Sequence, residues 1–194
     1  MAAAISFAEK PTLEGDLVLL RPVRRSDAAG LFAVHDETLR LTGSHRRATI
    51  EDLEAWYASR ADHDDRLDLS VIERASGGWA GEVVLNGLDP DNLSCGFRIG
   101  LAGPGYYGRG LGTEATRLIL AHAFEKVGVH RVELTVFAFN PRARRVYDKV
   151  GFVLEGTRRQ ALRWDGQWVD AQIMGILADE WSRHRGYPES RPTP

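Results

Sequence analysis

Five glycines lie between positions 103 and 112, and this cluster constrains the fold more than any other stretch of the chain. A strand-like run precedes it at 93–99, and a run with helical spacing follows it. Glycine costs conformational entropy inside regular structure, so such a cluster indicates a tight turn or a close approach to the backbone. A helix that starts near Leu111 would leave its first amide groups unpaired, and these groups attract anionic oxygens. The stretch therefore predicts a phosphate-binding loop between a strand and a helix.

Other phosphate-binding loops match this stretch less well. A P-loop would end in Gly-Lys-Ser/Thr, whereas Gly112 is followed by Thr113 and Glu114. A G-x-G-x-x-G pattern begins at Gly103, but Pro104 removes one amide and the chain upstream lacks alternating strands and helices. Nicotinamide-dinucleotide binding therefore remains only an alternative, as does a glycine-rich turn that binds no ligand.

The composition is that of an ordinary globular protein, with 43% hydrophobic and 27% charged residues. A formal net charge of -2 and the lack of a dense basic block argue against nucleic-acid binding. Cys95 is the single cysteine, so an intrachain disulfide is excluded, and its place in a strand-like run indicates a packed thiol. No window approaches about 18 uninterrupted apolar residues and the start lacks a signal-peptide pattern. We therefore expect a cytoplasmic protein that does not span a membrane.

Hydrophobic periodicity and turn signals divide the chain into strands and helices. Strands are predicted at 16–22, 67–74, 79–88, 93–101, 131–139, 152–162 and 167–177, and helices at 27–35, 49–60, 111–127 and 141–150. The three strands just before the glycine cluster are joined by short turns and should form an antiparallel meander. From Ser182 the chain is rich in Arg, Pro and Ser, so we expect a single domain, 1–181, followed by a disordered tail, 182–194.

A second informative segment runs from Asn140 to Phe152. Asn140 suits the N-cap of a helix, Pro141 its first position and Gly151 the residue just past its end. Tyr147 lies seven residues after Asn140, which is two helical turns, and therefore on the same face. Taken alone, Asn140 is explained as a cap and Tyr147 as a half-buried core tyrosine.

Together the two segments resemble the signature of the GNAT N-acetyltransferase superfamily. The pattern Asn-x-x-Ala-x-x-x-Tyr-x-x-x-Gly-Phe at 140–152 matches the second half of that signature. The six residues from Tyr107 to Gly112 resemble the Q/R-x-x-G-x-G/A loop for the pyrophosphate of acetyl-coenzyme A, with Tyr107 departing from Gln/Arg. The Leu-Arg-Pro opening at 20–22 and the stretch 164–170 resemble the RimJ/RimL-like branch, which contains ribosomal-protein N-acetyltransferases.

The resemblance implies an α+β GNAT fold, with a mixed, mostly antiparallel sheet of six to seven strands splayed at its centre and about four helices. Acetyl-coenzyme A would lie in the opening between strands 93–101 and 131–139. Its pantetheine would bond to the main chain of the first strand, and its pyrophosphate to the amides of the glycine loop. The residues implied in cofactor binding are Arg98, Ile99, Leu101, Tyr107, Gly108, Arg109, Gly110, Leu111, Gly112, Thr113 and Asn140.

The implied reaction is attack of a neutral amine on the acetyl thioester, with Tyr147 donating a proton to the departing thiolate. The general base stays open. Glu82 is the first choice, because its strand borders the acceptor side. Leu162 stands where some relatives have a glutamate, and a water chain or an amine that arrives neutral would also serve.

The resemblance leaves the acceptor open between a protein N-terminus and a small amine. The loop 43–47, Trp56 and the hairpin tip at 164–165 are candidates to contact it. A catalytically silent sensor or partner-docking module that binds coenzyme A is the alternative function. No cluster has metal-ligand spacing, so no metal is expected, and dimerisation through the terminal strands is common in the family.

Overall fold

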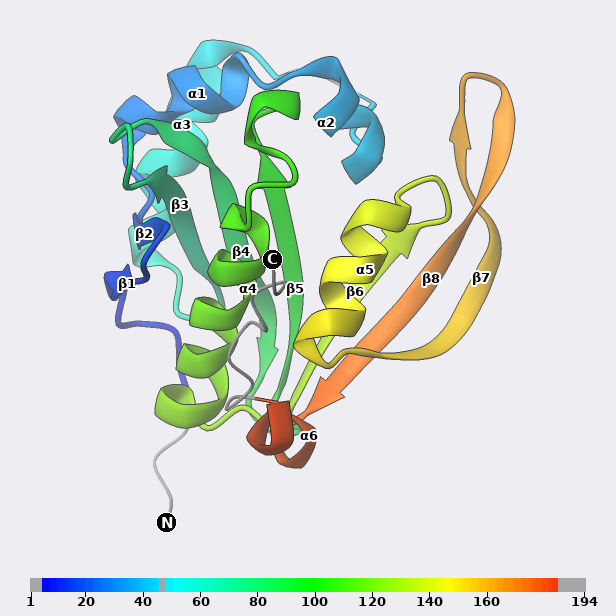
Figure 1. Cartoon of the computed structure of the whole chain (residues 1–194). Coiled ribbons are helices and arrows are strands. Elements are labelled where there is room, and N and C mark those ends of the chain that lie inside the picture. The colour runs from blue at the N-terminus through cyan, green and yellow to red at the C-terminus, as the bar shows by residue number, and fades with distance from the viewer. Residues whose placement is uncertain (1–4, 46–47, 185–194) are drawn as a thin grey trace, which may run out of the picture.

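The computed structural model describes residues 5–45 and 48–184, which fold around one mixed eight-stranded sheet (Figure 1). The strand order across this sheet is β1-β2-β3-β4-β5-β6-β8-β7. The strands are β1 (Leu13–Glu14), β2 (Val18–Pro22), β3 (Leu67–Glu73), β4 (Trp79–Asp89), β5 (Ser94–Leu101), β6 (Arg131–Phe137), β7 (Val153–Trp164) and β8 (Gln167–Leu177). The predicted class, a mixed and mostly antiparallel sheet with helices, is confirmed.

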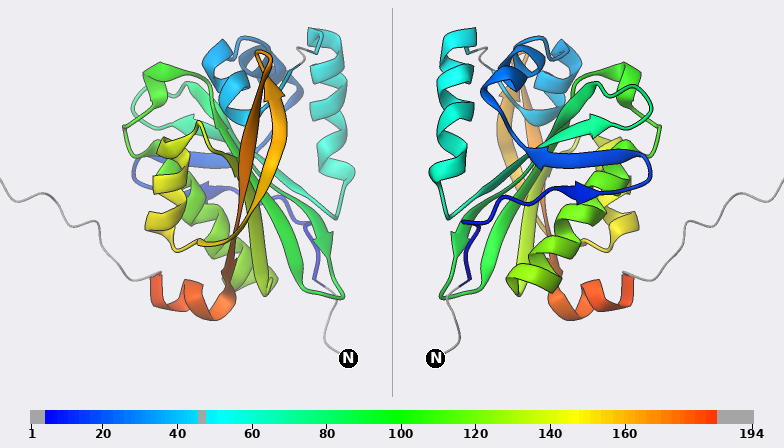
Figure 2. Two further views of the ribbon diagram at one scale, coloured as in Figure 1. Left: turned by 90° about the vertical axis from the view of Figure 1, so that its right-hand side faces the viewer. Right: turned by 90° about the vertical axis from the view of Figure 1, so that its left-hand side faces the viewer.

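Helices cover both faces of the sheet, with α4 and α5 on one face and α3 on the other (Figure 2). A π-helical turn continues α4 as far as Gly128, whose φ of 85° ends the helix. The helices are α1 (Ala28–Phe32), α2 (Asp36–Thr42), α3 (Ile50–Ser59), α4 (Leu111–Ala121), α5 (Pro141–Val150) and α6 (Ala178–His184).

The sheet splays open between β5 and β6, its one parallel pair among the described strands. These strands pair only at three positions, Ser94–Arg131, Cys95–Val132 and Gly96–Glu133. Beyond them, β5 stays paired with β4 as far as Leu101, and β6 stays paired with β8 as far as Phe137. The facing backbone groups at 97–101 therefore have no neighbouring strand, and buried peptide groups of this kind need other partners.

The main core lies between the sheet and α4. Leu111, Ala115, Ile119 and Leu120 of α4 are all 3% exposed or less. Burying a leucine or isoleucine side chain of this kind contributes about 1.5–3 kcal/mol to folding. Cys95 is buried in the same core, and burial raises the pKa of its thiol to about 12, which confirms the predicted packed thiol.

Three short elements were not predicted from the sequence: β1, α2 and α6. β1 has only two residues, too few to show a periodic pattern. α2 begins where the His35 ring accepts a hydrogen bond from the Glu37 amide at 3.1 Å, and ends at Gly43, whose φ is 69°. α6 runs through His184, so the tail expected to be disordered from Ser182 is helical in its first three residues. The rest of that predicted tail, 185–194, lies outside the described residues.

Within the described ranges, no helix has both the length and the apolarity to cross a bilayer. The same part of the chain holds no group of three or more His, Cys, Asp or Glu side chains arranged to bind a metal ion.

Candidate active site

The splayed strands open into a cleft of about 750 Å³. Residues from both halves of the sheet line it, together with α1, α2, α3, the glycine loop and α5. The cleft therefore brings together segments that are distant in the sequence. The predicted site residues that line it are Glu82, Arg98, Ile99, Leu101, Tyr107, Gly108, Gly110, Gly112, Thr113, Asn140 and Tyr147.

The glycine loop forms one end of this cleft. A short 3₁₀ turn, Pro104–Tyr106, carries the chain out of β5, and Gly110 then caps α4. Gly108 and Gly110 have φ angles of 71° and 83°, a region in which side chains with a Cβ are strained. The glycines are required here by backbone conformation, as the sequence pattern indicated.

The amides at 108–113 have no hydrogen-bond acceptor among the described residues. The first amide of this helix with a backbone partner is that of Glu114, which donates to the Gly110 carbonyl at 3.0 Å. Unpaired amides at the positive end of a helix dipole form a favourable site for phosphate oxygens. The loop thus has the chemistry of a diphosphate site.

Tyr107 fixes the loop to α2 through its side chain. Its hydroxyl lies 2.5 Å from Thr38 Oγ1, and Thr38 Oγ1 donates to the Leu101 carbonyl at 2.8 Å. The Arg142 guanidinium lies 3.9 Å from the centre of the Tyr107 ring and forms an ion pair with Glu37 at 3.4 Å. The position at which the sequence departs from Gln/Arg is thus occupied by a structural tyrosine that has an arginine stacked on it.

Tyr147 lies on the cleft-facing side of α5. Its ring packs edge-on against Phe97 and Phe152, with centroids 6.0 and 5.8 Å away, and the residue is 7% exposed. No described side chain holds a buried oxygen or nitrogen without a partner, and no described residue bonds to the Tyr147 hydroxyl. The hydroxyl therefore reaches the open space of the cleft. Burial raises the pKa of this phenol, so it is protonated at neutral pH and can donate a proton.

Asn140 caps α5 as predicted. Its Oδ1 accepts a hydrogen bond from the Ala143 amide at 3.1 Å, and Nδ2 donates to the Leu41 carbonyl at 3.5 Å. Pro141 follows at the first helical position, and Gly151 ends the helix with a φ of 111°. These features place Tyr147 two turns below the cap, on the same face of the helix.

Glu82 projects from β4 into the cleft, where it is partly buried. The Tyr57 hydroxyl of α3 donates a hydrogen bond to Glu82 Oε2 at 2.7 Å. Burial raises the pKa of Glu82, while the hydrogen bond from Tyr57 and the positive charge of Arg98 oppose the rise. A carboxylate with a raised pKa, in the same cleft as the protonated phenol of Tyr147, has the chemistry of a general base.

Comparison with known proteins decides the family. The sequence profile of the Acetyltransferase (GNAT) domain matches residues 18–153, which is most of the chain. The chain is a GNAT acetyltransferase. This enzyme therefore takes an acetyl group from acetyl-coenzyme A and transfers it to an amine.

Individual relatives of the GNAT enzyme agree with this assignment. It is 27% identical over 180 residues to YjcK of Bacillus subtilis (strain 168), named as a probable N-acetyltransferase, covering 85% of this chain and 96% of YjcK. It is 29% identical over 170 residues to the spermidine N(1)-acetyltransferase of Escherichia coli (strain K12), covering 84% and 88% of the two chains. A solved GCN5-related N-acetyltransferase from Brucella melitensis superposes with a TM-score of 0.77 and 28% identity, covering 95% of this chain and 86% of that one.

Two predicted cofactor residues of the GNAT enzyme have side chains that face away from the cleft. The Arg109 guanidinium pairs with Glu73 and donates to the Gly105 carbonyl at 3.1 Å. Leu111 is 3% exposed and packs in the core, so only its amide is directed to the loop. A contact between Arg109 and the pyrophosphate would need this ion pair to open.

The acceptor side of the enzyme contains a residue that the sequence did not single out. Tyr57 is 2% exposed and holds Glu82, whereas its neighbour Trp56 is 45% exposed and lines the cleft. Adjacent positions on a helix point about 100° apart, so the two side chains diverge. Of the other acceptor candidates, His45 stacks on Trp164 with centroids 4.8 Å apart, and Arg46 and Arg47 lie outside the described residues.

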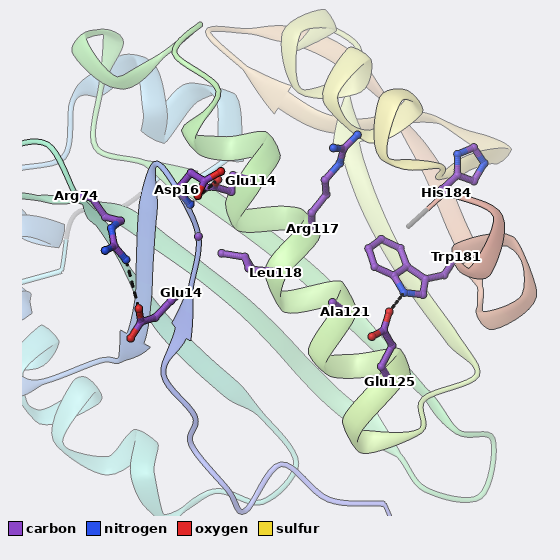
Figure 3. A pocket seen from close by; sticks show the side chains of 11 residues that line it. Glu14, Asp16, Arg74, Glu114, Arg117, Leu118, Ala121, Glu125, Trp181 and His184 are labelled. Atoms are coloured by element: carbon purple, nitrogen blue, oxygen red, sulfur yellow. Dashed lines mark hydrogen bonds and ion pairs between the residues drawn. The ribbon is translucent and has the colours of Figure 1, made fainter. Parts of the chain in front are cut away.

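A second pocket lies away from the cleft, between the turn before β2, α4 and α6 (Figure 3). Three of its carboxylates are bonded to the protein itself. Glu125 accepts from Trp181 Nε1 at 3.0 Å, and Glu14 pairs with Arg74 at 3.5 Å. Glu114 accepts from the amides of the turn at 16–18, at 2.7–3.0 Å. The carboxylates of this pocket join neighbouring elements of the fold, and none of the predicted site residues lines it.

Glu114 is expected to contribute measurably to stability. Replacing Glu114 with alanine removes the acceptor for three amides and should lower the free energy of unfolding by about 2–3 kcal/mol. Glu114→Gln keeps an acceptor oxygen without the charge and should lose about half as much. The denaturant midpoint of the three proteins measures this. Equal midpoints for wild type and Glu114→Ala would contradict the expectation.

Proposed function

We propose that acetyl-coenzyme A lies between β5 and β6, with its pyrophosphate on the amides at 108–113 and its thioester beside Tyr147. The row of unpaired amides at the start of α4, in the same cleft as the Tyr147 hydroxyl, carries this proposal. The pantetheine pairs with the free edge of β5 at Arg98, Ile99 and Leu101, as an added strand would. Asn140 stands at the cleft wall, where its side chain already holds the first turn of α5.

The reaction follows from this placement. The acceptor nitrogen attacks the acetyl carbonyl, and a main-chain N–H near Ile99 stabilises the oxyanion. The new C–N bond forms as the C–S bond breaks. Tyr147 gives its proton to the departing thiolate, and the amine gives up one proton, so that the products are an amide and a thiol. The Tyr147 hydroxyl has no hydrogen-bond partner among the described residues, which supports its role as the acid.

Glu82 is the base in this proposal, acting on the ammonium or on the tetrahedral intermediate. Its carboxylate lies in the cleft, and its raised pKa favours acceptance of a proton near neutral pH. Leu162, at the position where a glutamate was considered, is buried in the β7–β8 hairpin. As a leucine it has no group that accepts a proton, and it does not line the cleft.

Tyr57 is a positioning residue for Glu82, and this role predicts a change in pH dependence. Glu82 acts as a base only when deprotonated, so kcat/KM falls as the pH drops through its pKa. Tyr57→Phe removes a hydrogen bond to the charged form, raises the pKa of Glu82 further and should move the acid limb of the profile to higher pH.

The pH–rate profiles of both proteins with one acceptor measure this shift. Because the acceptor amine titrates identically in the two experiments, the difference between the profiles reports on Glu82. If Tyr57→Phe lowered the maximum of kcat/KM but left the acid limb at the same pH, Tyr57 would contribute only to packing.

We infer that the acceptor is a primary amine, either a protein N-terminus or a small molecule. The RimJ/RimL-like stretches at 20–22 and 164–170 favour the N-terminus, and the similarity to a spermidine acetyltransferase favours a small amine. A cytoplasmic setting suits both. A homodimer through the terminal strands is part of the same proposal, and the exposed Val153 and Leu154 on edge strand β7 support it.

An acceptor screen tests the proposed function. Thiol release from acetyl-coenzyme A should appear with at least one class of amine when peptides, amino acids, polyamines and monoamines are compared. A protein that binds coenzyme A tightly but releases no thiol with any class would be the silent sensor instead.

A further inference from the structure

The side chain of Arg98 lies on the acceptor face of the sheet. Val84 pairs directly with Arg98 across β4 and β5, and Glu82 pairs with Gly100. Directly paired residues of antiparallel strands point to the same face, so Glu82 and Arg98 are diagonal neighbours, about 7–8 Å apart. Both residues line the cleft, and Arg98 is exposed. Phe97, next along β5, points to the other face and packs against Tyr147.

The other ion pairs on this face are already complete. Arg66 forms two hydrogen bonds to Asp68, each at 2.7 Å, and Arg21 pairs with Asp27 at 2.7 Å. Arg98 has no hydrogen bond or ion pair with any described residue. The acceptor face therefore offers the Glu82 carboxylate for the reaction and one guanidinium, that of Arg98, whose charge acts on Glu82 at a distance but which forms no direct ion pair with a described residue.

This charge balance is unsuited to a polyamine. An acceptor with several positive charges would place a second cation beside Arg98 and would find Asp68 already neutralised. A guanidinium is instead suited to a carboxylate, which it binds in a planar, bidentate geometry. Apolar side chains line part of the same cleft: Leu31, Phe32, Leu53, Trp56 and Trp79.

We propose that the acceptor is a free amino acid with an apolar side chain, whose α-carboxylate binds Arg98 while its amine faces Glu82. The side chain of the amino acid would pack against the apolar residues of the cleft. This inference rests on the proposed acetyl transfer and names its substrate class. It makes Arg98 the residue that selects the acceptor through its side chain, in addition to any backbone contact with the pantetheine.

Four acceptors separate the contributions of amine, carboxylate and charge: L-phenylalanine, L-phenylalaninamide, 2-phenylethylamine and spermidine. Thiol release is measured for wild type, Arg98→Met and Arg98→Glu. Arg183→Met, which removes an exposed arginine of α6 paired only locally with Asp179, is the matched control. The dipeptide amide Phe-Ala-NH₂ tests for a peptide N-terminus.

Wild type and Arg183→Met should use L-phenylalanine at least about 10-fold better, in kcat/KM, than the three acceptors without a carboxylate. Arg98→Met should lower the ratio of kcat/KM for L-phenylalanine to that for 2-phenylethylamine about 10- to 100-fold, whatever its effect on the rate with both acceptors. Arg98→Glu should reverse the preference toward spermidine.

Other results overturn the inference in distinguishable ways. Equal or better use of 2-phenylethylamine, spermidine or Phe-Ala-NH₂ by wild type would remove the free amino acid as substrate while acetyl transfer stands. An unchanged ratio in Arg98→Met would remove Arg98 from selection. Thiol release with none of the acceptors, nor with any amine of the wider screen, would overturn the acetyl transfer itself and the inference with it.

Discussion

Replacing Tyr147 with phenylalanine is expected to lower kcat about 100-fold and to leave the affinity for coenzyme A within about 2-fold of wild type. General acid catalysis by a side chain contributes about 10²–10⁴-fold, and a thiolate, being a moderately good leaving group, needs the lower end of that range. The substitution removes a single oxygen that has no partner among the described residues. The ring contacts with Phe97 and Phe152 remain, so the fold should be unaffected.

Steady-state kinetics and calorimetric titration with coenzyme A measure the two quantities separately. Tyr107→Phe is the informative comparison, because the Tyr107 hydroxyl is bonded to Thr38 and anchors the loop. That variant should raise the KM for acetyl-coenzyme A and change kcat little. Full turnover in Tyr147→Phe would mean that the thiolate departs unprotonated and that Tyr147 only packs.

Replacing Gly110 with valine is expected to weaken coenzyme A binding by about 100-fold or more. Gly110 has a φ of 83°, which a β-branched residue adopts only with strain, and a Cβ there would lie 2.9 Å from the Leu17 side chain. Relief of that strain turns the amides that follow away from one another. Hydrogen bonds from amides to a charged phosphate contribute about 1.5–3 kcal/mol each, so the loss of one or two accounts for the expected change.

Gly87→Val provides the control for strain alone. Gly87 has a φ of 61°, nothing lies within 4 Å of its added Cβ, and it does not line the cleft. Both variants should lose comparable stability in thermal melts, but only Gly110→Val should lose affinity in the titration. Equal affinity of Gly110→Val and wild type would show that the diphosphate does not rest on this loop.

The local features of the site could be predicted because each depends on residues that are close in sequence. The glycine loop follows from φ angles that only glycine adopts easily at positions 108 and 110. α5 follows from its cap at Asn140, its proline at the first position and its glycine stop. The helix predicted from residue 49 likewise begins with a local motif, a capping box in which Thr49 and Asp52 exchange hydrogen bonds of 3.1 and 3.4 Å.

The parts that could not be predicted join residues far apart in the chain. Tyr57 and Glu82 are separated by 25 positions, and Thr38 and Tyr107 by 69. Sequence periodicity and spacing do not indicate contacts between such distant positions. Each partner by itself has the pattern of an ordinary helix, strand or loop residue. α2 was missed for a related reason: it is seven residues long, and only one of its side chains, Thr38, is buried. A short helix with so little buried surface carries no apolar stripe to recognise.

The sequence by itself determined the order of the longer strands and helices, the glycine-rich turn before α4 and the helix that carries Tyr147. These depend on backbone conformation and capping, which are local and can be read from the residues involved. Only the tertiary structure decided which groups share the cleft: the Tyr57–Glu82 hydrogen bond, the ion pairs that neutralise Asp27 and Asp68, and an Arg98 guanidinium without a direct ion pair to any described residue. Charge pairing and burial depend on distances across the folded sheet, because the strength of an electrostatic interaction is set by separation in space and by the surrounding medium, not by separation along the chain.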